Sequence, residues 1–308
     1  GYVTRLTGMP QYVPTELMTF IVRAWEVVAP YASATGCGAI DIDAVPYWLC
    51  LDEMNLAPVE QYFADYLSVL ESRIYEFDKY SCDPLVSKEL IKQLEAGGAS
   101  LRESLGVSSD GLWDYFRFHG IQLPPNLIVA GTVNMDETTH GFSRKVIDRA
   151  ITLDFGEFYP NEYKDFFDPS AIPAAFSWST LTHASTDRLE NTWDFDGKKS
   201  IGFLEGVNTI LKQTPFELAY RALNELLLQV TCIEPSSDIE LQAVWDDFLM
   251  MKILPRIEGD DDKLRSTSGQ SQGNVLEELD GFLSAELGLI WSRGRTDFFR
   301  INLSGEDD

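Results

Sequence analysis

The chain has 308 residues, and 49 acidic against 24 basic side chains give it a formal net charge of −25 at pH 7. Because 44% of the residues are hydrophobic and 12% are aromatic, we expect a packed core, and the length suits about two domains. This composition excludes global disorder. No apolar stretch is long enough to span a membrane and the first residues show no signal pattern, so we expect a cytoplasmic protein without membrane contact.

The acidic surface also limits the classes of ligand. An excess of carboxylates repels phosphate backbones, so binding of DNA would need a local group of basic residues or another domain. The four cysteines are far apart, without a CxxC pair, and they are Cys37, Cys50, Cys82 and Cys232. With only three scattered histidines, a zinc site or disulfide framework is not expected. We expect Cys50, which lies in an apolar run, to be a small core residue.

The first predicted elements are a strand and a helix. Residues 47–51 (YWLCL) form a continuous apolar run, which is typical of a strand buried on both faces of a parallel sheet. After a break at residues 55–58, apolar side chains recur at helical spacing at Val59, Tyr62, Phe63, Tyr66, Leu67 and Leu70. Residues 72–123 then form a mixed, partly helical insertion that contains Gly97 and Gly98.

A second strand is predicted at residues 127–133 (LIVAGTV), and a short helix should begin after Ser143 as its N-cap. A third strand is predicted at residues 151–155. Alternation of strands and helices is typical of an α/β layer fold, so we expect a first domain over residues 1–158 with a parallel sheet between helices.

The rest of the chain is predicted to be helical. Residues 159–199 show no clear period and form a connector. Helical periodicity then places apolar residues at 219–230, 241–249 and 276–290, which predicts an all-helical second domain over residues 200–308. The polar segment 259–273 is expected to be a solvated loop.

Two predicted strands end in polar residues that suit phosphate chemistry. Asp52 and Glu53 follow the first strand, and Asn134 follows the second. Ligands of open parallel sheets bind at the carboxyl ends of the strands. One carboxylate there can hold Mg²⁺ through its waters while a neighbouring carboxylate orients an attacking water. Taken alone, the Asp-Glu pair fits equally well a strand that simply ends in solvated residues.

The wider context resembles a known family. The run WLCLDEMNLA at residues 48–57 resembles the Walker B region of AAA+ ATPases, specifically the branch of the McrB restriction GTPase and related dynein-type and MoxR-neighbouring proteins. The run NLIVAGTVNMD at 126–136 resembles that branch's sensor strand, and FSRKVIDRA at 142–150 is similar to its arginine-finger helix. In the second domain, FELAYRALNE at 216–225 and KILPRIEG at 252–259 resemble segments of its helical lid.

The resemblance implies a three-layer αβα core with a helical lid, and it implies roles for single residues. Asp52 would be the Mg²⁺ carboxylate, Glu53 the catalytic base and Asn134 the first sensor. Arg149 would be the arginine finger, with Arg144 as the second candidate. Arg221 of the lid would be a second sensor, and arginine suits these roles because its guanidinium forks onto phosphate oxygens. The structural alternatives are a salt bridge of Arg149 with Asp148 and pairing of Arg221 with Glu217 or Glu225 along a helix.

The family's phosphate loop, GxxxxGK[ST], is missing from the sequence. The nearest imitation is Gly197-Lys198-Lys199-Ser200, which has Thr192 in place of the first glycine and lies in the connector. Residues 1–8 resemble the segment that follows the loop in the family, so we expect the phosphate loop upstream of Gly1. The chain alone is then expected to bind ATP or GTP weakly and to hydrolyse neither; a degenerate, non-hydrolysing module is the alternative.

The resemblance also implies a biological role. The complete protein would be a ring-forming hexameric hydrolase, the motor of an McrBC-like restriction system, with an McrC-like nuclease as its partner and DNA held through other domains or pore residues. A ring that remodels a protein partner, or serves as a scaffold, is the alternative from a different class. Residue motifs do not choose between ATP and GTP. No GxSxG turn is present for a serine hydrolase, and the Asp260–Asp262 run lacks the ligand pattern of a calcium loop.

Overall fold

The computed structural model describes residues 2–4, 11–29, 32–36, 40–41, 43–76, 79–98, 100–134, 144–153, 178, 182, 184–257, 263–264 and 274–291. Contacts divide the chain into two compact units. Unit 1 comprises Gly1–Phe142 and Ala175–Thr182, and unit 2 comprises Ser143–Ala174 and His183–Asp308. The chain is a mixed α/β protein. The predicted domain limits at residues 158 and 200 stay predictions.

Unit 1 contains all described strands and six of the helices. Its strands are β1 (Tyr2–Thr4), β2 (Gln11–Val13), β3 (Tyr47–Leu51), β4 (Ile74–Glu76), β5 (Lys79–Ser81), β6 (Pro84–Val86), β7 (Ile121–Gln122) and β8 (Leu127–Gly131). Its helices are α1 (Glu16–Val28), α2 (Val59–Tyr62), α3 (Ala64–Glu71), α4 (Lys88–Ala96), α5 (Leu101–Leu105) and α6 (Asp110–His119), and a 3₁₀ turn, η1, covers Met54–Leu56.

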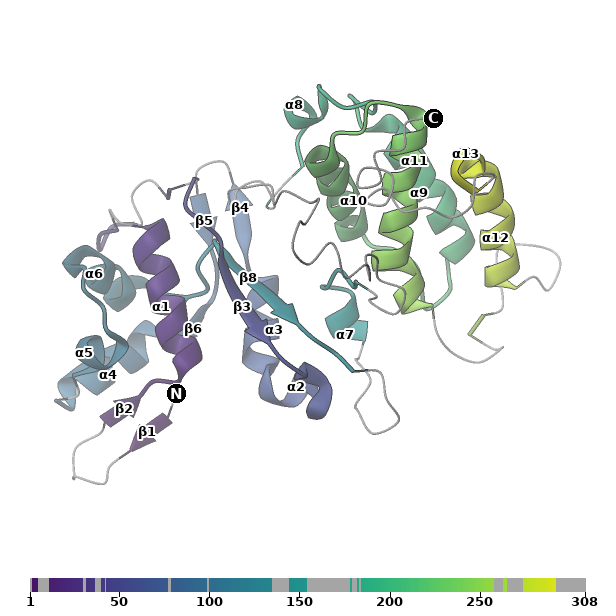
Figure 1. Cartoon of the computed structure of the whole chain (residues 1–308). Helices are drawn as coiled ribbons and strands as arrows, with labels where there is room; N and C mark the ends of the chain where they lie inside the picture. Colours follow the sequence, from purple (N-terminus) through teal and green to yellow (C-terminus); the bar gives the residue numbers. More distant parts are fainter. Residues whose placement is uncertain are drawn as a thin grey trace, which may run out of the picture. The chain divides into compact units, whose positions relative to one another are not determined.

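The pair of strands that positions the candidate site is β3 with β8. They run parallel and in register, from Tyr47 opposite Leu127 to Leu51 opposite Gly131, and they lie side by side in Figure 1. The two strands therefore end at the same edge. The strands predicted at residues 47–51 and 127–133 are confirmed, except that β8 ends at Gly131.

The main core of unit 1 is built by α1 and the predicted insertion, which is partly helical as expected. Thr15 caps α1 by accepting from the N–H of Met18, and the inner face of the helix is apolar. Trp25 on that face is fully buried, and its indole N–H donates to the Gln122 carbonyl at 2.7 Å. The Trp25 ring lies 5.5 Å from that of Tyr115 in α6. The insertion therefore supplies the surface on which α1 packs.

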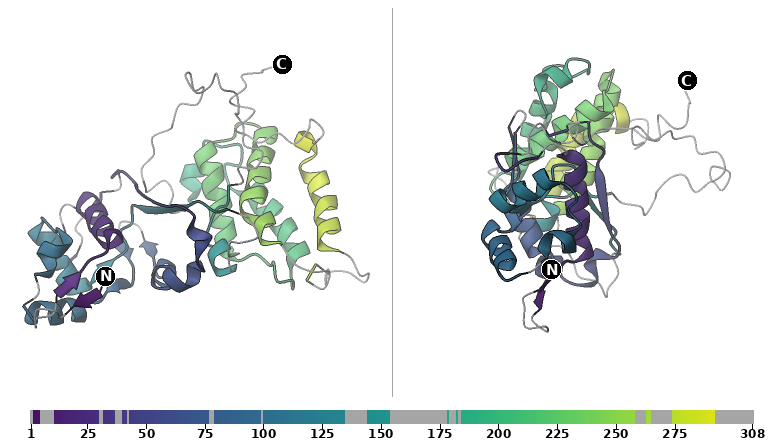
Figure 2. Two further views of the ribbon diagram at one scale, coloured as in Figure 1. Left: turned by 60° about the horizontal axis from the view of Figure 1, so that its bottom comes forward. Right: turned by 90° about the vertical axis from the view of Figure 1, so that its left-hand side faces the viewer.

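Unit 2 is helical over its described residues. Its helices are α7 (Arg144–Ile147), α8 (Thr186–Leu189), α9 (Lys198–Leu211), α10 (Tyr220–Ile233), α11 (Asp238–Phe248), α12 (Val275–Glu286) and α13 (Gly288–Trp291). A π-helical turn, η4 (Leu249–Ile253), and a 3₁₀ turn, η5 (Leu254–Arg256), continue α11. Both views of Figure 2 show α9 to α12 grouped together, and Phe203 stacks on Trp245 between α9 and α11 with ring centroids 4.6 Å apart.

Three sequence-based expectations need correction. β3 is not buried on both faces, because Trp48 remains 49% exposed and Cys50 is exposed. Cys50 is therefore not a core residue. The predicted third strand does not form over residues 151–153, where Ile151 and Leu153 are exposed. The Thr152 N–H there donates to the Met251 carbonyl at 2.9 Å, so a contact with the helical unit replaces a strand ladder.

Several expectations fall outside the described residues. These are the cap at Ser143, the rest of the third strand at residues 154–155, most of the connector, and most of the loop at residues 259–273. None of the helices in the described ranges combines the length with the apolar composition that a membrane crossing requires.

Candidate functional site

The candidate site lies at the edge where β3 and β8 end. Asp52 and Glu53 directly follow β3, and Thr132 and Asn134 follow β8. The parallel register carries both chain segments to the same edge. Two backbone hydrogen bonds extend the pairing past the strands, since the Thr132 N–H donates to the Leu51 carbonyl at 2.9 Å and the Met54 N–H donates to the Thr132 carbonyl at 3.0 Å. The polar side chains are thus placed by main-chain contacts.

Thr132 is the centre of this edge. Its hydroxyl donates to Asp52 Oδ1 at 2.5 Å and accepts from the backbone N–H of Glu53 at 2.8 Å. A single hydroxyl therefore fixes one carboxylate and the backbone of the next. Thr132 was predicted to lie inside a strand and was given no role. A hydroxyl residue two positions before a candidate sensor at a strand end is the signal that could have identified it.

Glu53 adopts a left-handed backbone conformation, with φ 49° and ψ 47°. For a residue with a Cβ this conformation is strained, and such strain is typical of functional positions. The Glu53 carboxylate accepts a hydrogen bond from Asn134 Nδ2 at 3.2 Å. The structure therefore brings together Asp52, Glu53 and Asn134, all three of which are exposed to solvent.

Asn55 supports this arrangement from below the surface. The side chain is buried, and its Nδ2 donates to the Asn134 carbonyl at 2.8 Å. Its Oδ1 has no hydrogen-bond partner among the described residues. Asn55 was not predicted as a site residue, because nothing in its sequence context distinguishes it from an ordinary turn residue.

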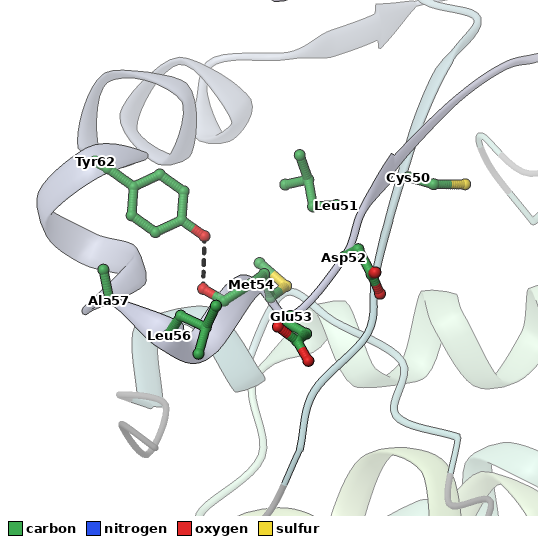
Figure 3. Close-up of a pocket in the computed structure, with 8 residues that line it drawn as sticks. All are labelled: Cys50, Leu51, Asp52, Glu53, Met54, Leu56, Ala57 and Tyr62. Atoms are coloured by element: carbon green, nitrogen blue, oxygen red, sulfur yellow. Dashed lines mark hydrogen bonds between the residues drawn. The ribbon is translucent and has the colours of Figure 1, made fainter. Parts of the chain in front are cut away.

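A depression of about 350 Å³ adjoins the carboxylates, and it is lined by Cys50, Leu51, Asp52, Glu53, Met54, Leu56, Ala57 and Tyr62. Figure 3 shows Tyr62 reaching towards Met54 across this depression, while Cys50 points away on the other side of β3. The Tyr62 hydroxyl donates to the Met54 carbonyl at 2.7 Å. This bond closes the turn that carries Glu53 onto α2.

The donor set fits a magnesium ion held mainly through water. No group of three or more His, Cys, Asp or Glu side chains that could hold a metal occurs in the described part of the chain. Mg²⁺ in nucleotide sites commonly takes one or two carboxylates together with waters and substrate phosphates. Asp52 presents an exposed carboxylate with one oxygen oriented by Thr132, which suits that kind of ligation.

The candidate arginines lie in unit 2. Arg144 begins α7, and its side chain lies outside the described residues. Arg149 follows α7 in a turn, is half-buried, and donates its backbone N–H to the Val146 carbonyl at 3.0 Å. Arg221 is the second residue of α10 and is exposed.

The structural alternatives for these arginines can now be compared with observed ion pairs. The carboxylate of Asp148 pairs with Arg256 Nε at 2.9 Å. The carboxylate of Glu225 pairs with Lys252 Nζ at 2.8 Å, while Arg221 forms no ion pair within 4.0 Å among the described residues. Lys252 and Arg256 were recognised in the sequence only as part of a family-like segment without a role.

The segment at residues 197–200, which partly matches the phosphate-loop motif, has its helix N-terminus occupied by a side chain of the protein. α9 begins at Lys198, and the buried carboxylate of Asp194 accepts from the backbone N–H groups of Lys199 at 3.0 Å and Ser200 at 2.9 Å. These are the groups that a phosphate would need at a helix N-terminus. Asp194 therefore caps the helix, and the segment is not a phosphate site.

Comparison with known proteins adds one match. A family model described as "Domain of unknown function (DUF8727)" matches residues 179–299. This range covers α8 to α13 of unit 2. None of the curated proteins matches the chain, and none of the solved structures does.

Proposed function

We propose that this chain supplies the catalytic carboxylates of a nucleoside triphosphatase of the AAA+ type, in the McrB-like branch. The observation that carries the proposal is the junction made by Thr132, which joins Asp52 to the backbone of Glu53 at the shared ends of two parallel strands. In the proposed fold, β3 and β8 are neighbouring strands of the central sheet of a three-layer core, and residues 200–308 form the helical lid.

Each residue at the edge has a separate task in this proposal. The Asp52 carboxylate would hold Mg²⁺ through waters, and Mg²⁺ when bound would neutralise charge on the phosphates. Glu53 would orient the attacking water and accept its proton. Asn134, which donates to the Glu53 carboxylate, would keep that carboxylate turned towards the water. The left-handed backbone of Glu53 ends the extended geometry of β3 directly after Asp52, and the proposal gives the two neighbouring carboxylates separate roles.

The proposal assigns to residues 1–308 only part of a complete site. No GxxxxGK[ST] motif occurs in the sequence, and Asp194 occupies the one similar helix N-terminus. Backbone N–H groups and a lysine of such a loop provide most of the grip on phosphates. The chain by itself should therefore bind Mg-ATP and Mg-GTP weakly and turn over neither.

The arginines extend the proposal to an assembly. In a homo-hexameric ring, Arg149 of one subunit would stabilise charge on the phosphate bound by the next subunit, and Arg221 would sense the same nucleotide. An McrC-like nuclease would be the partner, in restriction of foreign DNA. A hydrolysis rate that DNA stimulates would support this role, whereas stimulation by a protein partner alone would point to a remodelling ring.

The decisive experiment measures binding and turnover separately in the complete gene product. Glu53→Gln should bind ATP or GTP as the wild type does but lose hydrolysis, because the amide cannot accept a proton from water. Arg149→Ala should also lose hydrolysis while each subunit still binds nucleotide. Asp65→Asn, at an exposed position in α3, is the matched control and should be unaffected. Normal hydrolysis by both site variants would show that the assignment is wrong.

A second experiment uses the chain of 308 residues. With Mn²⁺ and ATP or GTP at millimolar concentration, the backbone amide resonances of Thr132 and Asn134 should broaden, since the ion would lie beside Asp52. Asp52→Asn should remove this broadening, and calorimetry should find an affinity weaker than micromolar. Equal broadening in Asp52→Asn would place the ion elsewhere, and micromolar affinity would contradict the partial site.

A further inference from the structure

Lys252 of η4 is buried to a degree that is unusual for its type. Its exposed fraction is 2%, and among the described residues no other lysine or arginine is classed as buried. Taking an ammonium group out of water is costly unless partners replace its hydration. The partners of Lys252 therefore show what its burial accomplishes.

Two N–H groups of the Lys252 ammonium donate hydrogen bonds, and a carboxylate oxygen lies at ion-pair distance. Nζ donates to the backbone carbonyls of Asp148 and Ala150, both at 2.9 Å, and pairs with Glu225 Oε2 at 2.8 Å. The two carbonyls belong to the residues on either side of Arg149. The buried ammonium of Lys252 therefore binds the backbone immediately before and immediately after Arg149.

Neighbouring contacts hold the same turn. The Met251 carbonyl accepts from the N–H of Thr152 at 2.9 Å, and Arg256 Nε pairs with Asp148 Oδ1 at 2.9 Å. The segment from Met251 to Arg256 therefore contacts alternate residues of 148–152. Lys252 is presented by a π-helical turn, a local distortion that is frequent at functional sites.

We propose that Lys252 is a positioning residue for Arg149. With Glu225 as its counter-ion, Lys252 clamps the turn at residues 148–150 to the helices of unit 2. The clamp sets the direction in which the Arg149 side chain points. The inference rests on the proposed function, in which Arg149 acts on phosphate. It assigns a task to the Lys252–Arg256 segment, which the functional proposal leaves without one.

Electrostatics agree with this geometry. Burial lowers the pKa of the Lys252 ammonium and burial raises the pKa of the Glu225 carboxyl, and each is opposed by the attraction of its partner. A buried ammonium held against this shift needs compensation, and the Glu225 carboxylate and the two carbonyls beside Arg149 supply it. Removing the cation would leave the two carbonyls without their donor and the carboxylate without its counter-ion.

The first test is hydrogen exchange in the chain of 308 residues. Lys252→Met removes the donor but keeps the apolar stem, so the amides of Arg149, Ala150 and Thr152 should exchange roughly tenfold faster or more. Amides of α9 should keep their protection. Lys252→Arg should restore part of the protection of the turn. Unchanged exchange in Lys252→Met would overturn the clamp.

A milder variant covers the case in which Lys252→Met disrupts unit 2. Glu225→Gln removes the counter-ion while keeping the side chain's size and an acceptor oxygen, and it should accelerate exchange at the turn of residues 148–150 more than in α9. Uniform acceleration over both regions would show that the pair stabilises the unit in general and does not act on the turn. Unchanged exchange in both regions would show that the Glu225 carboxylate contributes nothing to the turn, and this result would also overturn the clamp.

The second test measures hydrolysis by the complete gene product. Lys252→Met should lower kcat about tenfold or more with little change in nucleotide KM, because a misdirected Arg149 weakens transition-state contacts only. Lys252→Arg should recover part of the rate, and Lys199→Met, at an exposed lysine paired with Asp238, is the control. If hydrolysis depends on Glu53 but not on Lys252, the positioning role is wrong. If no Glu53-dependent hydrolysis exists, the proposed function fails, and the exchange experiment still decides on the clamp.

Discussion

The left-handed backbone at Glu53 leads to a prediction about stability that is independent of any activity. Glu53→Ala and Glu53→Gly both delete the carboxylate and the hydrogen bond from Asn134, so they differ in backbone preference alone. A residue with a Cβ loses roughly 1–2 kcal/mol in the left-handed region. Glycine avoids that loss, but its more flexible unfolded chain costs about 0.4–1 kcal/mol.

The difference between these two effects gives the expected magnitude. Glu53→Gly should be more stable than Glu53→Ala by about 0.8 kcal/mol, which is the difference between the middles of the two ranges. At Lys92, an exposed position inside α4, the order should reverse, since glycine is about 1 kcal/mol worse than alanine in a helix. The reversal between the two positions separates backbone strain from a general preference for either residue.

Urea unfolding followed through one resonance is a suitable assay. The indole N–H of Trp25 is buried and donates to the Gln122 carbonyl, so its resonance reports on unit 1. The free energy of unfolding should change with an unchanged dependence on urea. If Glu53→Gly is no more stable than Glu53→Ala, Glu53 does not adopt the left-handed conformation, and the argument that strain marks this position fails.

Three further predictions concern single side chains. Burial raises the pKa of Tyr66 to about 12. The free energy of unfolding should therefore be highest below the unfolded-state pKa near 10 and should fall by about 2–3 kcal/mol as the pH rises to 12. Urea titrations at alkaline pH should show that Tyr66→Phe reduces this loss. A Cβ at Gly131 would lie 2.1 Å from the sulfur of Met54, so Gly131→Ala should lower the free energy of unfolding by about 1–3 kcal/mol. Adding Met54→Ala to the same chain should recover much of this loss. Additive losses in the double-mutant cycle would contradict the contact. Asp194→Ala should lower the unfolding free energy of unit 2 by about 1–3 kcal/mol in thermal denaturation, because two N–H groups of α9 lose a buried acceptor. Glu205→Ala, at an exposed position of the same helix, should change it little.

The elements with strong local signals were predicted from the sequence. Continuous apolar runs identified β3 and β8, and helical periodicity identified α10, α11 and α12. The carboxylates and Asn134 were selected because each follows an apolar run that ends abruptly. α1 was missed, although Thr15 and the spacing of its apolar residues carried the signal of a capped amphipathic helix.

Other features depend on contacts between distant segments. The third predicted strand failed because its residues 151–153 meet the Met251 carbonyl and not a neighbouring strand. Trp48 and Cys50 looked like core residues, yet a two-stranded pair leaves much of its surface uncovered. The roles of Thr132 and Lys252 rest on partners roughly 80 and 100 positions away in the sequence.

The sequence by itself therefore determined β3, β8, α10, α11 and α12 and the polar residues that follow the two strands, because helix and strand periods act over a few neighbouring residues. Only the tertiary structure decided that Thr132 joins Asp52 to Glu53, that Glu53 is held in a strained conformation, and that the buried Lys252 donates to the carbonyls on both sides of Arg149. Those contacts arise from the register of two strands and from the packing of helices, and neither can be read from local preference.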